Sequence, residues 1–216
     1  QVREYIDSYA DHFNLRQQIR FNSSVDRIEP LGNAGSDGWR VTINGKPQVY
    51  AGVLVANGHL WDCAFPPQAQ NFSGISLHSG QYRNTEQLQG KVLVVGCGNS
   101  GCDLAVDAAQ HRLVTDIVIR RGQVFQPKAL LGVPRAEIPF LNDLPPELQN
   151  AFTQVLTLIS LGRWENYPGM PEPESWDLEK QPPVVNTLLM YWIQHGRISV
   201  RPGIDSISGK TVTFSD

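Results

Sequence analysis

The sequence predicts an α/β fold with a parallel sheet, and three consecutive patterns lead to that prediction. An uninterrupted apolar run at residues 92–95 is typical of a buried strand, and a glycine-rich turn follows it directly. A helical pattern that includes Ala105, Ala108 and Ala109 comes next, and a second apolar run at 117–119 ends the unit. Strand, helix and strand in this order form a βαβ unit, whose strands lie parallel in one sheet.

The first sixty residues predict a helix followed by a small antiparallel sheet. Apolar residues at spacings of three and one form a single stripe of a helix: Val2, Tyr5, Ile6, Tyr9, Ala10 and Phe13. Strand-forming residues then gather at 19–28, 39–43 and 49–56. The Asn44-Gly45 pair favours a tight hairpin between the last two strands, and the Pro66-Pro67 pair indicates a domain boundary near residues 60–85.

A proline-rich insertion is expected over residues 127–183, where it would shape a cleft edge or an interface. Residues 147–161 within it predict a helix ended by Gly162, with these apolar residues on one face: Leu148, Phe152, Val155, Leu156 and Ile159. A last helix is expected over 185–195, where Gly196 stops it, and strands at 198–201 and 211–214 follow.

The composition argues against several classes of protein. A formal net charge of -3 gives no overall attraction for polyanions, so we expect no nucleic-acid partner. The cysteines Cys63, Cys97 and Cys102 form no C-x-x-C pair and are odd in number, which favours a reducing cytoplasm and predicts no metal site. No stretch approaches the roughly 20 apolar residues of a membrane-spanning helix.

The turn after the first buried strand has the pattern Gly96-x-Gly98-x-x-Gly101, with Cys97, Asn99 and Ser100 between the glycines. The first glycine permits a tight turn, the second lets the backbone approach a pyrophosphate, and the third lets helix and strand pack closely. Glycine turns of this spacing are common, and the strand before it and the helix after it are what favour dinucleotide binding. We therefore expect a Rossmann-type domain with three layers of sheet and helices.

Two arginines follow the second strand of this unit, where such domains contact the ribose of the nucleotide. An acidic residue at this place selects NAD, whereas a cation accommodates the 2′-phosphate of NADP. Arg120 and Arg121 occupy it, which predicts a preference for NADPH, although a pair of solvated surface arginines would look the same. Asp103 and Asp107 come too early for the ribose and are expected to favour the N-terminal half of the helix.

The two cysteines of this region, Cys97 and Cys102, have the spacing C-x-x-x-x-C. A redox role and a role as small residues that let backbone and ligand approach are both open, and the position within a phosphate loop favours the second.

A segment at residues 72–82 fits neither strand nor helix periodicity. Its pattern is F-x-G-x-x-x-H-[S/T]-x-x-[Y/F], formed by Phe72, Gly74, His78, Ser79 and Tyr82. Taken alone, His78 would be read as a structural histidine. The pattern resembles the fingerprint of the flavin-containing monooxygenases, and motifs in the same order along nearly the whole chain extend the resemblance. The form of the glycine loop and residues 182–186 resemble the bacterial members and the plant indole-pyruvate enzymes.

The resemblance implies two dinucleotide-binding domains, one for FAD and one for NADPH. NADPH would reduce the flavin, and the flavin would activate O2 as a C4a-hydroperoxide that oxygenates a small organic substrate at sulfur, nitrogen or a carbonyl. Residues 1–60 would be the remnant of the FAD domain, 61–89 a linker and 90–216 the NADPH domain. Asn57 and Gly58 would lie at the cofactor, and His78 with its neighbouring aromatic residues would act as a hinge or positioning element.

The chain departs from the family pattern because Gly96 to Gly101 is its only G-x-G-x-x-G motif. It resembles a middle section of such an enzyme, which by itself would bind NADPH without turnover. Two alternatives stay open. One is a non-catalytic NADPH-binding sensor, and the other is a flavoprotein disulfide reductase, which the absence of a C-x-x-C pair disfavours. Exposed sheet edges and apolar faces of a partial domain also make a homo-oligomer a hypothesis.

Overall fold

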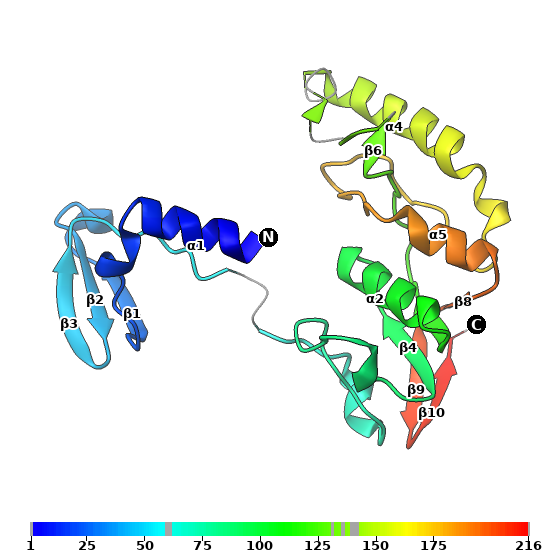
Figure 1. Ribbon diagram of the computed structural model, residues 1–216, viewed down its shortest axis with the longest axis horizontal. Helices are drawn as coiled ribbons and strands as arrows, with labels where there is room; N and C mark the ends of the chain where they lie inside the picture. The colour runs from blue at the N-terminus through cyan, green and yellow to red at the C-terminus, as the bar shows by residue number, and fades with distance from the viewer. Residues whose placement is uncertain (1, 59–61, 131, 135–136, 139–142, 216) are drawn as a thin grey trace. The chain divides into compact units, whose positions relative to one another are not determined.

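Two units make up the chain, Gln1–His59 and Leu60–Asp216, and each is described by itself. The structure is a computed structural model that describes residues 2–58, 62–130, 132–134, 137–138 and 143–215 (Figure 1). Within these ranges no helix has the length and apolar character needed to cross a membrane.

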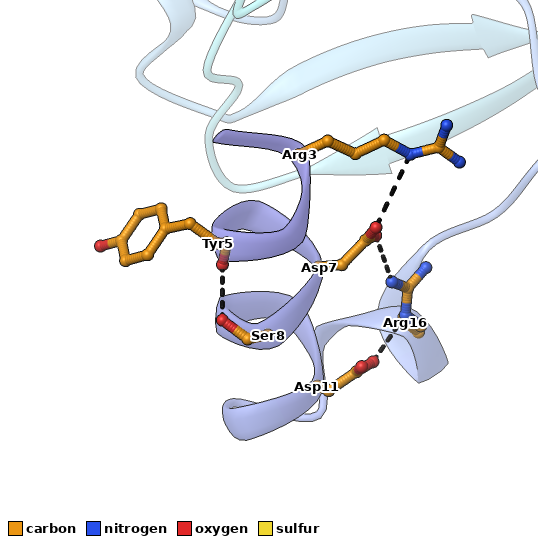
Figure 2. A network of polar contacts seen from close by, with 6 residues as sticks. All are labelled: Arg3, Tyr5, Asp7, Ser8, Asp11 and Arg16. Carbon is orange, nitrogen blue, oxygen red and sulfur yellow. Dashed lines mark hydrogen bonds and ion pairs between the residues drawn. The ribbon is translucent and has the colours of Figure 1, made fainter. Parts of the chain in front are cut away.

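The first unit begins with helix α1 (Val2–His12) and the short 3-10 helix η1 (Leu15–Gln18). Arg16 joins the two elements, since its Nη2 atom lies 2.6 Å from Oδ1 of Asp7 and its Nε atom 2.7 Å from Oδ1 of Asp11 (Figure 2). These hydrogen bonds to Asp11 and Asp7 raise the pKa of Arg16 above its usual value. Asn14 turns the chain between the helices with a left-handed φ of 52°.

The apolar stripe predicted for this helix is present but exposed. No residue of α1 is buried, and Val2, Tyr5 and Ile6 expose 75%, 67% and 59% of their surface. Towards the end of the stripe the rings of Tyr9 and Phe13 lie 4.7 Å apart. Helical periodicity therefore predicted the helix correctly, while the described residues of this unit do not cover its apolar side.

An antiparallel sheet completes the first unit, in the order β1 (Val25–Pro30), β2 (Trp39–Ile43) and β3 (Lys46–Tyr50). The 3-10 turn η2 (Asn33–Gly35) lies between β1 and β2. Asn44 and Gly45 have φ values of 47° and 74°, as the predicted two-residue hairpin requires. The Asn44 side chain also accepts a hydrogen bond from the Ser24 amide at 2.9 Å, which fixes the start of β1 beside the turn.

Two strand predictions in this unit were wrong in extent. The strand expected over 19–28 starts only at Val25, and the strand expected over 49–56 ends at Tyr50. Beyond Tyr50, Leu54 is 98% exposed and pairs with no strand among the described residues. Apolar, β-branched residues favour a strand, but a strand forms only where a neighbouring chain supplies hydrogen-bond partners.

The second unit contains the expected parallel sheet, in the order β4 (Lys91–Val95), β5 (Val114–Val118) and β8 (Ile198–Arg201). Both strand pairs are parallel, with Val94 opposite Ile117 and Ile117 opposite Val200. Helices α2 (Asn99–Gln110) and α5 (Thr187–Gln194) contact each other and pack on this sheet (Figure 1). The predicted α/β class with a Rossmann-type sheet is confirmed. The fully buried core between these elements includes Ala105, Ile117, Phe125, Leu189, Met190 and Ile198.

Several short elements surround this sheet. The described ones are the 3-10 turns η3 (Pro67–Asn71), η4 (Thr85–Gln87) and η6 (Trp164–Asn166), the two-residue strands β6 (Ala129–Leu130) and β7 (Val133–Pro134), and the hairpin of β9 (Ile204–Ser208) and β10 (Thr211–Phe214). Strand β9 is absent from the sequence-based predictions because its polar residues weaken the strand pattern. The hairpin holds the chain near Phe72, since the Ser73 amide donates to the Gly209 carbonyl at 2.9 Å.

Helix α4 (Pro146–Leu161) lies in the insertion and ends at Gly162, as predicted. Its buried residues are nevertheless Thr153 and Thr157, while most of the predicted apolar face is exposed, Ile159 by 75%. The Thr157 hydroxyl donates to the Phe125 carbonyl at 3.0 Å, and the Thr153 hydroxyl accepts from Nε2 of the Gln126 side chain at 3.1 Å. The hydroxyls satisfy buried polar groups that an apolar side chain would leave unpaired, which explains why they face inward.

A buried carboxylate ties the three parallel strands together. Asp116 on β5 exposes 4% of its side chain and lies 2.8 Å from Lys91 Nζ on β4 and 3.3 Å from Arg201 Nη2 on β8. Arg201 in turn stands over the ring of Phe214 in the β9–β10 hairpin, 5.6 Å from its centroid. The ion pairs therefore connect the three neighbouring strands, and the contact of Arg201 with Phe214 extends the connection to the hairpin.

We predict that Asp116→Ala lowers the free energy of unfolding by about 1 kcal/mol, because the substitution removes both ion pairs, whose strength is limited by the exposure of Lys91 and Arg201 to solvent. Urea unfolding followed by circular dichroism measures this change. Asp205→Ala is the control, since Asp205 on β9 is exposed and has no ion-pair partner among the described residues. Equal effects of the two substitutions would show that Asp116 does not hold the strands.

Candidate dinucleotide-binding site

The glycine loop connects β4 to α2 through a backbone that requires glycine at two positions. Gly96 has a φ of 105°, which side chains other than glycine rarely adopt. A Cβ atom added to Gly101 would lie 2.1 Å from the Gly96 carbonyl oxygen. The first turn of α2 thus approaches the end of β4 more closely than any side chain would allow, as the motif predicts.

The middle glycine has a different environment. A Cβ atom added to Gly98 would meet nothing within 4 Å, and Gly98, Asn99 and Ser100 are exposed. Gly98 is the N-cap of α2 and no side chain caps the helix there. Backbone N–H groups at a helix N-terminus attract anions when nothing else satisfies them. The loop therefore offers an open surface with free donors, which suits a phosphate.

The two arginines lie just beyond the end of β5 and are both exposed. The chain there still extends the sheet, since the Ile119 amide donates to the Arg201 carbonyl at 2.9 Å. The aliphatic part of the Arg120 side chain lies beside Gly203, since a Cβ atom added to Gly203 would be 3.6 Å from Cδ of Arg120. Neither Arg120 nor Arg121 has an ion-pair or hydrogen-bond partner among the described residues, so both guanidinium groups are available to a ligand.

The cysteines of the loop contact each other. The sulfur atoms of Cys97 and Cys102 lie 3.7 Å apart, and both residues are buried and free. The contact with Cys97 and burial raise the pKa of the Cys102 thiol far above its usual value. A thiol of this kind forms little thiolate and is a poor nucleophile. In the described part of the chain no group of three or more His, Cys, Asp or Glu side chains could hold a metal ion.

The fingerprint segment, residues 72–82, packs within the second unit. A Cβ atom added to Gly74 would lie 2.6 Å from Cζ of Phe72, so a larger residue there would displace that ring. The His78 ring accepts a hydrogen bond from the Gly80 amide at 3.1 Å, which orders a turn, and Ser79 is exposed. The Tyr82 hydroxyl donates to Oδ2 of Asp107 on α2 at 2.5 Å. Burial and this hydrogen bond raise the pKa of Tyr82.

Asn57 and Gly58 lie at the end of the first unit and are exposed. Gly58 has a φ of 71°, so the chain turns there in the left-handed region. A role for the pair at a cofactor stays a prediction.

A segment far along the chain borders the glycine loop, and the sequence patterns noted at residues 182–186 did not predict this contact. The Val185 amide donates to Oδ1 of Asn99 at 2.9 Å, and the Asn186 side chain donates to Oδ1 of Asp103 at 2.7 Å. Asn186 exposes only 5% of its surface, and its side-chain oxygen caps α5 by accepting from the Leu189 amide. An Asn before an apolar helix is a capping signal, whereas its bond to α2 has no local sequence signature.

A parallel βαβ sheet with this glycine loop defines the second unit as a Rossmann-type domain, of the class that binds dinucleotides. The model of the flavin-binding monooxygenase-like family matches residues 1–216. The chain therefore belongs to the flavin-binding monooxygenase-like family.

Curated relatives agree with this assignment. The chain is 30% identical to the probable indole-3-pyruvate monooxygenase YUCCA1 of Arabidopsis thaliana, over 98% of this chain and 53% of the relative. It is also 30% identical to flavin-containing monooxygenase 3 of Oryctolagus cuniculus, over 100% of this chain and 43% of that protein. The chain thus spans about half the length of the curated relatives it matches.

Solved structures of similar fold include a mutant cyclohexanone monooxygenase from Rhodococcus sp. Phi1 bound to NADP+. It has a TM-score of 0.66 and 18% identity, over 97% of this chain and 52% of that one. A flavin monooxygenase from Stenotrophomonas maltophilia has a TM-score of 0.60 and 16% identity, over 96% and 51%. At these identities the likeness concerns the fold.

Two glycine substitutions should separate folding from binding. Gly98→Ala should leave stability nearly unchanged, because its Cβ points into open space, yet weaken NADP+ binding about tenfold or more by occupying the place of a phosphate. Gly101→Ala should destabilise the domain, because its Cβ would collide with the Gly96 carbonyl. Calorimetric titration and thermal unfolding measure the two effects. A stable Gly98→Ala variant with full NADP+ affinity would contradict the proposed position of the phosphate.

Proposed function

We propose that the chain is the NADPH-binding portion of an FAD-dependent monooxygenase that oxygenates a small organic substrate. The observation that carries the proposal is the open glycine loop with two unpartnered arginines beside the next strand. Membership of the flavin-binding monooxygenase-like family supports it. NADPH supplies a hydride for the flavin, and the reduced flavin reacts with O2.

The residues of the loop fit a dinucleotide phosphate. The N–H groups at the start of α2 would hold the pyrophosphate, assisted by the positive end of the helix dipole. Gly101 permits the tight loop and the Cys97 side chain is buried, while Asn99 uses its side-chain oxygen to accept from the residue 185 amide. The backbone therefore provides the anion site, and Ser100 can add an exposed hydroxyl.

Arg120 and Arg121 would distinguish NADPH from NADH. A guanidinium group can bind the 2′-phosphate through two parallel hydrogen bonds, and neither group has to break an ion pair first. No acidic residue stands at this position to bind a ribose 2′-hydroxyl.

The first unit would contribute to the FAD domain, with residues 1–60 as part of that domain, 61–89 as the linker and 90–216 as the NADPH domain. In this arrangement Asn57 and Gly58 contact a cofactor, and His78 and Tyr82 position the linker. The curated relatives named indole-3-pyruvate monooxygenases support a small organic substrate, since they show that the family includes enzymes for molecules of that size.

Nucleotide preference gives the first test. Arg120→Ala and Arg121→Ala should each weaken NADP+ binding about tenfold, since a hydrogen bond to a charged group contributes about 1.5 kcal/mol or more. NAD+ binding should stay unchanged, because NAD+ has no 2′-phosphate. Calorimetric titration of both nucleotides measures the difference.

Arg197→Ala is the matched control, since Arg197 is also exposed but precedes β8 rather than following β5. Equal affinity of the unaltered protein for NAD+ and NADP+ would contradict the assignment of the two arginines.

The oxygenation proposal needs the full protein that carries this chain. A bound flavin absorbs visible light, and NADPH oxidation that consumes O2 and increases with substrate would support a monooxygenase. NADP+ binding with no flavin would instead favour a nucleotide-binding sensor.

A further inference from the structure

Helix α2 carries a row of polar side chains from its first turn to just past its last residue. Asn99, Asp103, Asp107 and His111 follow one another at intervals of four, so they lie along one side of the helix. The opposite side is apolar, with Cys102, Ala105 and Ala109 fully or almost fully buried in the core. We call the four residues the polar stripe of α2.

The N-terminal half of the polar stripe holds the segment that leads into α5. Asn99 accepts from the Val185 amide at 2.9 Å, and Asp103 accepts from the Asn186 side chain at 2.7 Å. Asn186 is buried and also caps α5, so both of its polar atoms are used within the fold. These contacts fix the part of α2 that adjoins the glycine loop.

The C-terminal half of the stripe holds the fingerprint segment. Oδ2 of Asp107 accepts from the Tyr82 hydroxyl at 2.5 Å, while Oδ1 lies 3.3 Å from the His111 ring. Tyr82 ends the turn that His78 begins, since the Tyr82 amide donates to the His78 carbonyl at 3.2 Å. Asp107 is thus the point on α2 to which the turn of residues 78–82 is attached.

We propose that Asp107 is a positioning residue that couples occupancy of the glycine loop to the fingerprint turn, with α2 as the connecting element and Tyr82 as its contact. This inference rests on the proposed NADPH-binding function. A nucleotide phosphate would contact the first turn of α2, and Asp107 lies about 12 Å further along the same helix. The buried apolar side of α2 keeps the helix rigid. A small displacement or ordering of its first turn by a bound nucleotide would therefore be transmitted to Asp107.

The fingerprint pattern accepts either Tyr or Phe at position 82, and Phe has no hydroxyl to donate. The bond to Asp107 is therefore a property of this chain rather than of the pattern. It also allows a small substitution, because Tyr82→Phe removes one oxygen atom and leaves the ring in place.

Trypsin cleavage after Arg83 reports on the turn, since Arg83 is exposed and follows Tyr82 directly. In the full protein, saturating NADP+ should slow this cleavage about tenfold, within the usual range of coupling between two sites. We call this slowing of cleavage by NADP+ the protection. In the Tyr82→Phe and Asp107→Leu variants the protection should fall below about twofold. Mass spectrometry that quantifies the peptide starting at Asn84 measures the rate.

Conservative and control variants complete the experiment. Asp107→Asn keeps an oxygen that accepts from the Tyr82 hydroxyl, so it should retain most of the protection. Tyr50→Phe is the matched control, because it removes a tyrosine hydroxyl bonded to Gln48 at 2.7 Å in the first unit. It should leave protection at Arg83 unchanged.

The outcomes separate the inference from the function on which it rests. If Tyr82→Phe and Asp107→Leu change cleavage by the same factor with and without NADP+, the contact is only structural and the inference is overturned. Calorimetry on the unaltered protein tests the function independently. Absence of NADP+ binding there would overturn the proposed function, and the inference with it.

Discussion

The close approach of α2 to the end of β4 is the constraint on which the second unit depends. No atom beyond hydrogen fits between Gly101 and the Gly96 carbonyl, where an added Cβ would lie 2.1 Å from the oxygen. This contact sets the direction in which the helix leaves the strand, and hence where its free N–H groups point. The proposed anion site, the buried side of α2 and the polar stripe all follow from the position of that first turn.

Apolar packing and polar contacts both hold α2 in place, and they do so in different ways. Small residues such as Ala105 and Ala109 let the helix lie close to the sheet, and the larger Leu189 and Met190 of α5 fill the remaining space. Packing of this kind is strong but weakly directional. The bonds of Asp103 and Asp107 add direction, because a hydrogen bond requires a defined geometry. The polar contacts therefore orient the helix, while the apolar contacts hold it against the sheet.

Two surfaces show what the fold leaves uncovered. The stripe of α1 and the outer face of α4 expose several large apolar side chains, including Tyr5, Ile6 and Ile159. Exposed apolar patches of this kind mark contacts with other parts of a protein or with other chains. Association between copies of the chain thus stays a hypothesis that light scattering can test, and the insertion that carries α4 is expected to shape a cleft edge or an interface.

The sequence by itself determined the features that depend on neighbouring residues. Glycine spacing after an apolar run predicted the loop at Gly96 and the βαβ unit, and the Asn44-Gly45 pair predicted the hairpin, because short-range sterics decide both. Only the tertiary structure decided contacts between distant residues. The part of the strand expected over 49–56 that lies beyond Tyr50 pairs with no strand among the described residues. Threonines of α4 face the core, and Tyr82 and Asn186 contact α2. Those outcomes depend on which groups meet in space, and a local pattern contains no information about a partner many residues away.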